Sequence, residues 1–253
     1  MSNRKIGICG DSFMSAVIYN ESDLDNGYDK HFTDILSKKL NISLITFAKA
    51  GSSNQAIRLQ ISEIIKERPD FVIVGTTSPE RVELPINDKS YEYNNGIFNI
   101  FYSNCPNTST LHPKFKQIEP KMVSTTFYDI ITGGFNMFYS KEQIKTFKLW
   151  FENFFDEKWK KQIDSWIISD GLQELQDNHI DFYCINSHLN EKNLERFGEK
   201  IIGYNSELNP WNYYNPNNNQ KYWFHTGLEE QEILAEKWYD KIKDKDCLKT
   251  KFL

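Results

Sequence analysis

The stretch Lys5-Ile6-Gly7-Ile8-Cys9-Gly10-Asp11-Ser12 joins an apolar run, a glycine stop and a serine two positions later. Such a run, cut off by glycine, is typical of a buried strand. In an open parallel α/β sheet the carboxyl ends of the strands face the ligand crevice. A serine at that place would face the crevice, where a nucleophile could reach a bound ligand. The alternative is a polar turn that leads into a helix, and this stretch does not decide between the two.

Strand and helix patterns alternate along the rest of the chain. Five apolar runs have the length of strands: 6–9, 42–47, 71–74, 180–185 and the short run 201–204. Apolar residues at helical spacing occupy about 30–40, 54–68, 144–166 (as one helix or two) and 228–243. Largely apolar strands separated by helices predict a parallel sheet covered on both faces. We therefore expect a three-layer α/β/α fold with a mostly parallel, five-stranded, flavodoxin-like sheet.

The regular alternation lapses over about 84–179, where turn residues and aromatic residues are mixed. A structureless connection of this length is unusual inside a compact domain, so an aromatic-rich insertion is expected there. With it, residues 1–253 are expected to form a single domain. A loop is expected over 209–220, which is rich in Asn and Pro.

Composition excludes several classes of protein. The net charge of −5 argues against a general nucleic-acid binder, which needs a basic surface. No apolar run approaches the ~18 residues of a membrane span, and the first residues lack a secretory signal pattern, so a cytoplasmic protein is expected. The four cysteines have no C-x-x-C spacing and the five histidines no H-x-x-x-H spacing, so neither a metal site nor a cofactor is expected.

Three polar loops follow the first three predicted strands, and a histidine precedes the last predicted helix. The loops contain Gly10-Asp11-Ser12, Gly51-Ser52-Ser53-Asn54 and Gly75-Thr76-Thr77-Ser78, and the histidine is His225. This order resembles the SGNH, or GDSL-type, hydrolase family. The resemblance covers roughly residues 4–83 and 222–243 and leaves the middle unmatched. No Walker A or G-x-G-x-x-G phosphate loop is present, which disfavours a nucleotide-binding domain.

The resemblance implies a Ser-His centre for ester hydrolysis. Ser12 would attack the substrate, and His225 would take its proton and later protonate the leaving alcohol. The oxyanion would be held by the backbone N–H groups of Ser12 and Gly51 and by the side chain of Thr77. On the blander interpretation, Gly51 is a turn glycine and His225 merely flanks a helix.

Two positions depart from the family pattern. Thr77 stands where the family has an asparagine donor, and Tyr222 stands where it has an aspartate, three residues before the histidine. An acid from elsewhere (Glu83, or Glu229 with its neighbour Glu230) or a backbone carbonyl could orient His225. Asp11 is expected to hold its turn rather than to serve as that acid.

Other polar residues at the same edge are candidates for supporting or substrate-binding roles. Asn54 lies among the N-cap candidates of the second helix, and Ser78 could share the part of Thr77. Arg81 and Glu83 could bind a polar substrate or form a surface ion pair. His188 follows the fourth strand and is therefore also expected at this edge.

The favoured function is a serine esterase or acetylesterase that acts through an acyl-enzyme, with an acylated carbohydrate as one substrate class. The alternative is a binding or structural protein that keeps the fold without the activity. An association with a tailed phage, and so with a virion, would fit the aromatic insertion. The sequence does not indicate the oligomeric state.

Overall fold

The computed structural model describes residues 4–14, 30–49, 52–85, 122–125, 140–214, 226–245 and 248. Its main sheet has the strand order β2-β1-β3-β6-β7, and every neighbouring pair is parallel. These strands are β1 (Lys5–Cys9), β2 (Ser43–Thr46), β3 (Phe71–Gly75), β6 (Asp181–Ile185) and β7 (Ile201–Ile202). Counted along the chain this order is 2-1-3-4-5, which confirms the flavodoxin-like plan.

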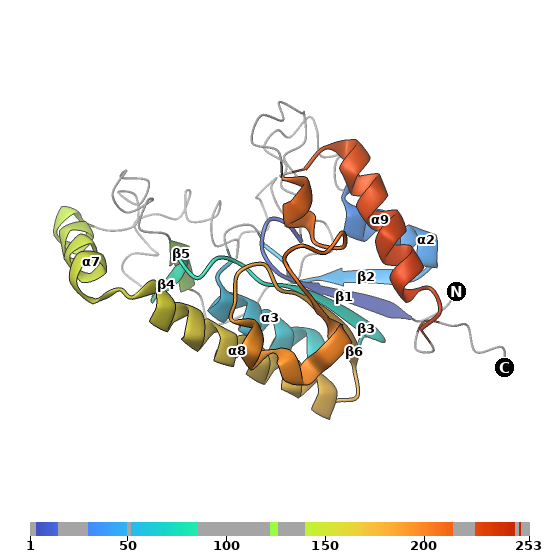
Figure 1. The fold of residues 1–253 in the computed structure, drawn as a ribbon, viewed down its shortest axis with the longest axis horizontal. Coiled ribbons are helices and arrows are strands. Elements are labelled where there is room, and N and C mark those ends of the chain that lie inside the picture. Colours follow the sequence, from blue (N-terminus) through green and yellow to red (C-terminus); the bar gives the residue numbers. More distant parts are fainter. Residues whose placement is uncertain are drawn as a thin grey trace.

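Helices cover both faces of the sheet (Figure 1). On one face lie α2 (Phe32–Leu40) and α9 (Leu228–Ile242), and on the other lie α3 (Asn54–Lys66) and α8 (Glu157–Asp177). Each face has its own cluster of buried residues, with Trp238 in one and Leu172 in the other, both fully buried. The predicted three-layer α/β/α fold is therefore confirmed.

Helix α3 approaches the sheet closely because Gly7 has no side chain. A Cβ at Gly7 would lie 2.4 Å from Cδ1 of Ile64, which belongs to α3. The glycine inside the first strand thus serves the packing of a helix on that strand.

The pattern over 144–166 belongs to two helices rather than one. Helix α7 (Lys141–Phe154) ends at Phe155, whose backbone is extended, and Asp156 then caps the start of α8. Helix α8 lies within the expected insertion, yet it is the crossover helix between β3 and β6 and packs on α3.

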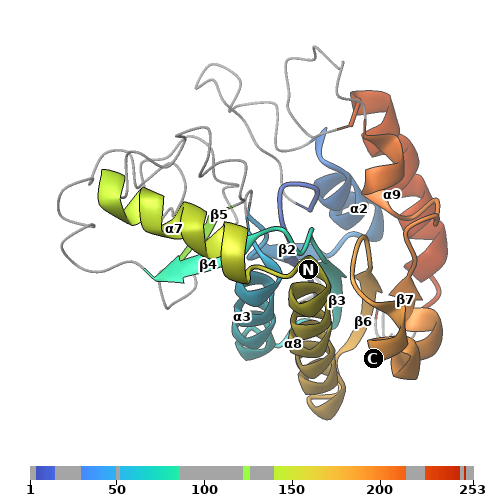
Figure 2. The ribbon, with the colours of Figure 1, turned by 60° about the vertical axis from the view of Figure 1, so that its left-hand side comes forward.

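The strands β4 (Val82–Pro85) and β5 (Met122–Thr125) pair antiparallel in a sheet of their own. They lie with α7 to one side of the main sheet (Figure 2). The short 3-10 helix Pro210–Tyr213 occupies part of the expected loop over 209–220.

Cys9 of β1 and Cys184 of β6 are buried free thiols on either side of β3, and burial is what their apolar runs predict. Burial raises the pKa of the Cys184 thiol to about 12, so it stays protonated. Across the described ranges, no helix is both long and apolar enough to cross a membrane.

Candidate active site

Ser12 lies where the sheet order reverses. Strand β1 lies between β2 and β3, so the chain first adds a strand on one side of β1 and then crosses to add the next on its other side. The crevice outside the carboxyl ends of the strands at such a reversal is the usual ligand site of open α/β sheets. Ser12 follows the end of β1 directly at this place and is 5% exposed.

A tight turn fixes the backbone around Ser12. The N–H of Met14 donates to the carbonyl of Asp11 (3.0 Å), and the N–H of Phe13 donates to Oδ1 of Asp11 (2.9 Å). Gly10 has φ +151°, which L side chains rarely adopt, and a Cβ there would lie 2.4 Å from Cγ of Met14. Ser12 is therefore held at the second position of a turn whose shape depends on glycine.

Asp11 connects this turn to the loop after β3. Its buried carboxylate accepts a hydrogen bond from Oγ1 of Thr77 (2.7 Å) and lies 3.4 Å from the Arg81 guanidinium. The expectation that Asp11 holds its turn agrees with these contacts. The single hydroxyl proton of Thr77 is thus directed to Asp11, so Thr77 could serve an oxyanion only by leaving that carboxylate.

The Arg81 side chain is 21% exposed and forms an ion pair with the buried Asp11. It also donates to the carbonyl of Ser52 at 3.0 Å. Arg81 therefore ties the loop after β2 to the turn of Ser12.

Gln60 joins the same two loops from the other side. Its Oε1 accepts from the N–H of Gly10 (2.6 Å), and its Nε2 donates to the carbonyl of Gly10 (3.2 Å) and to Oγ of Ser52 (3.0 Å). Gln60 was not among the site residues expected from the sequence. The available signal was a polar residue at position 60 on the apolar stripe that contains Ile57, Ile61 and Ile64.

Asn54 is fully buried and fixes the backbone of Thr77. Its Oδ1 accepts from the Thr77 N–H (3.0 Å), and its Nδ2 donates to the Thr77 carbonyl (2.9 Å) and to Asp164 (3.0 Å). The helix cap itself is Ser53. Burial raises the pKa of Asp164, a residue absent from the sequence expectations, against the opposing effect of Lys160 at 2.6 Å.

His188 lies at the same edge, after β6. Its ring packs edge-on against Trp211 (4.9 Å between centroids), and Trp211 stacks on Phe13 (3.9 Å), the neighbour of Ser12. Burial, and next the charge of Lys161, lower the pKa of His188, whereas Asp11 and Glu80 act in the opposite direction. The imidazole is therefore neutral at neutral pH.

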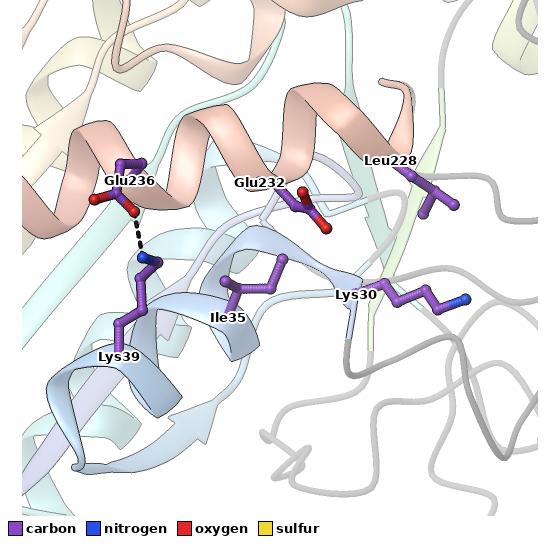
Figure 3. A pocket seen from close by; sticks show the side chains of 6 residues that line it. All are labelled: Lys30, Ile35, Lys39, Leu228, Glu232 and Glu236. Atoms are coloured by element: carbon purple, nitrogen blue, oxygen red, sulfur yellow. Dashed lines mark ion pairs between the residues drawn. The ribbon is translucent and has the colours of Figure 1, made fainter.

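An open groove of about 580 Å³ adjoins His188. Residues from α8, from the chain after β6 and from Tyr204 line it: Lys158, Lys161, Asn186, Ser187, His188, Leu189, Asn190, Glu191 and Tyr204. A second hollow of about 470 Å³ lies between α2 and α9, where Lys39 pairs with Glu236 (Figure 3). The first of these two hollows includes His188, which follows β6 at the edge that carries the site.

Several expected site residues lie outside the described part of the chain: Gly51, Tyr222 and His225, as well as the side chain of Glu83. Thr226, the residue after His225, is described and buried. Gln231 of α9 hydrogen-bonds Thr226 and also accepts from the N–H of Phe32 (2.7 Å), the first residue of α2. Ser78 is partly buried, and its Oγ accepts from the N–H of Glu80 at 3.3 Å. Within the described residues no cluster of potential metal ligands occurs.

No family model matches the chain, and no curated protein matches it. Solved structures that resemble it include esterases. One is a carbohydrate esterase (10% identity, 98% of this chain and 70% of that chain, TM-score 0.47). Another is the esterase EstA from Pseudoalteromonas sp. (9%, 96% and 97%, TM-score 0.42). A third is described as a lipolytic protein of the G-D-S-L family from Desulfitobacterium hafniense (11%, 92% and 97%, TM-score 0.38). These identities and TM-scores are too low to carry a function over to this chain. The chemistry of the site must therefore be inferred from the chain's own residues.

Proposed function

We propose that the chain is a serine hydrolase of carboxylic esters, with Ser12 as nucleophile and His225 as general base. The placement of Ser12 carries the proposal. It stands at the reversal of the sheet order, in a turn that the Asp11 carboxylate stabilises from within and that Gln60 and Arg81 contact through Gly10 and Asp11. So many buried contacts to one short turn are expected where a reacting group needs a fixed position.

The reaction proceeds in two balanced steps. Oγ of Ser12 bonds to the carbonyl carbon while His225 takes its proton, and His225 then protonates the alcohol that leaves. Water attacks the acyl-enzyme in the same way and releases the acid and Ser12. The oxyanion is held by the backbone N–H groups of Ser12 and Gly51, with Thr77 as a further donor if its hydroxyl leaves Asp11.

Thr226 supports the assignment of His225. Since Gln231 joins Thr226 to the first residue of α2, the chain next to His225 is anchored at the amino ends of α2 and α9. In a parallel α/β fold these ends lie on the side of the carboxyl ends of the strands, which is the side of Ser12.

The experiment is mass spectrometry after incubation with a fluorophosphonate. We expect one adduct on Ser12 in the wild type, none in Ser12→Ala and a strongly reduced yield in His225→Ala. Ser43→Ala is the matched control. Ser43 is exposed at the amino end of β2, away from the carboxyl ends of the strands where the site lies, so this substitution should leave the adduct unchanged.

Absence of an adduct on folded wild-type protein would favour the second candidate, a binding protein that retains the fold. The observation in its favour is the pair of departures at Thr77 and Tyr222. An adduct that persists in His225→Ala would show that another residue is the base. An acylated carbohydrate remains the substrate class that we propose.

A further inference from the structure

We infer that the groove beside His188 binds a negatively charged group of the substrate, next to the ester that Ser12 attacks. The inference rests on the proposed function for the ester itself and extends it to the class of substrate, an ester that bears a carboxylate or a similar oxyanion.

The charge of the groove supports an anion. Lys158 and Lys161 line it, and Glu191 is the acidic residue among the lining residues. Among the described residues, neither lysine forms an ion pair, whereas Lys160 between them pairs with Asp164. The groove therefore presents two ammonium groups against one carboxylate, and neither ammonium group is held in an ion pair with a described residue.

The two lysines lie near the amino end of α8, where Asp156 caps the helix and Glu157 stands in the first turn. Lys158 lies in the first turn of α8 and Lys161 in the second. The amino end of a helix carries a partial positive charge, which disfavours a cation in the first turn and favours an anion there. An anion in the groove would be attracted by the lysines and by the helix end together.

Polar groups of the groove add hydrogen-bonding capacity. Ser187 is 5% exposed, and its Oγ has no hydrogen-bond partner among the described residues. An unpaired buried hydroxyl costs free energy, which a ligand atom in this groove would recover. Asn186 and Asn190 also line the groove, but their side chains already bond to Leu189 and Gln162.

Two chains of contacts link the groove to the loops around Ser12. The N–H of Ser187 donates to Oγ1 of Thr76 (3.1 Å), which immediately precedes Thr77. His188 reaches the neighbour of Ser12 through Trp211. An anionic group held by the lysines would therefore lie beside the ester rather than at a remote surface.

His188 provides a readout that does not need activity. Lys161 is one of the groups that lower its pKa, and the other charges that act on it are those of Asp11, Glu80 and Arg81. An anion beside Lys161 should raise the pKa of His188. We would follow the imidazole proton of His188 by NMR, assigned with His188→Gln, while sulfate or benzoate replaces chloride at constant ionic strength.

The expected result is a saturable rise in the pKa of His188 in the wild type. In Lys158→Gln/Lys161→Gln the pKa should start higher and no longer respond. The matched control is Lys141→Gln/Lys145→Gln, two exposed lysines on α7, which should behave as the wild type. The absence of a saturable shift in the wild type would overturn the inference.

A pair of nearly isosteric esters tests the same groove in catalysis. We expect 4-acetoxybenzoate to exceed the neutral 4-acetoxybenzamide in kcat/KM by roughly tenfold at low salt, the scale of two partly screened charge pairs. The preference should vanish in the double lysine variant and weaken with salt. Equal rates for both esters, or a preference that survives in the variant, would overturn the inference and leave the proposed function intact. A shift of His188 with no hydrolysis of either ester would instead overturn the proposed function while supporting an anion site.

Discussion

Thr77 has one hydroxyl proton, and the structure directs it to the buried carboxylate of Asp11. We predict that Thr77→Val lowers the free energy of unfolding by about 1–3 kcal/mol, because a buried carboxylate loses a donor. Thr77→Ser keeps the hydroxyl and should stay close to the wild type. Urea denaturation of the three proteins measures the difference.

The same variants distinguish the structural role of Thr77 from a role in the oxyanion site. If the hydroxyl serves mainly the oxyanion, Thr77→Val would retain its stability and lose about 10²–10³ in the rate of acylation. That pattern would contradict the prediction of lost stability.

At the level of single residues, the sequence predicted which loops meet but not how they are joined. Ser12 and Thr77 could be placed together because both follow parallel strands. The contact of Arg81 with Asp11 depends on the course of the chain after β3, which no local pattern encodes. The partners of Gln60 belong to loops that precede it by 8 and 50 residues, so its role appears only in three dimensions.

Helix α3 carries the residue that holds two loops of the site, Gln60. We predict that Gln60→Ala lowers the free energy of unfolding by about 1–3 kcal/mol, because the buried N–H of Gly10 loses its partner, while the Gly10 carbonyl keeps its bond from the N–H of Lys49. The rate of fluorophosphonate labelling should fall with it, since the turn of Ser12 loses one of its supports.

Gln55→Ala is the control for this prediction, because Gln55 is exposed in the first turn of the same helix. Thermal denaturation and labelling rate are measured on both variants. Equal stability of the two variants would show that the contacts of Gln60 add little to the turn.

Among the elements, strands and helices of the core were predictable because their apolar periodicity is strong. The break within 144–166 was not, since apolar spacing runs on from α7 into α8 while Phe155 takes an extended backbone. The role of α8 as a core helix could not be predicted from the spacing of its apolar residues either. Its packing on α3 depends on the pairing of β3 with β6, which is a tertiary contact.

The two faces of the sheet share the same five strands, so the molecule should unfold as one unit. Leu36 of α2 and Leu172 of α8 lie on opposite faces and are both fully buried. We predict that Leu36→Ala and Leu172→Ala each lower the free energy of unfolding by about 2–5 kcal/mol. Each should shift a single unfolding transition, common to both faces, to lower urea.

Urea titrations followed by far-UV circular dichroism and by tryptophan fluorescence test this cooperativity. The two signals should coincide in the wild type and in both variants. A variant in which one signal changes at lower urea than the other would show that the two faces unfold independently.

The pairing of β3 with β6 also limits the order in which the elements can fold during synthesis on the ribosome. Thr76 and Ile185, which hydrogen-bond across these strands, are 109 positions apart in the chain. Strands β1, β2 and β3, with the turn of Ser12, Gln60 and Arg81, can therefore assemble while much of the protein is still to be synthesised. The groove of His188 and the anchor of Thr226 can join them only later, once β6 and the chain after it have been made. A chain that has been made only as far as Arg81 thus contains the turn of Ser12 but not the His188 groove or the chain next to Thr226. The candidate site is completed only after those later residues have been synthesised.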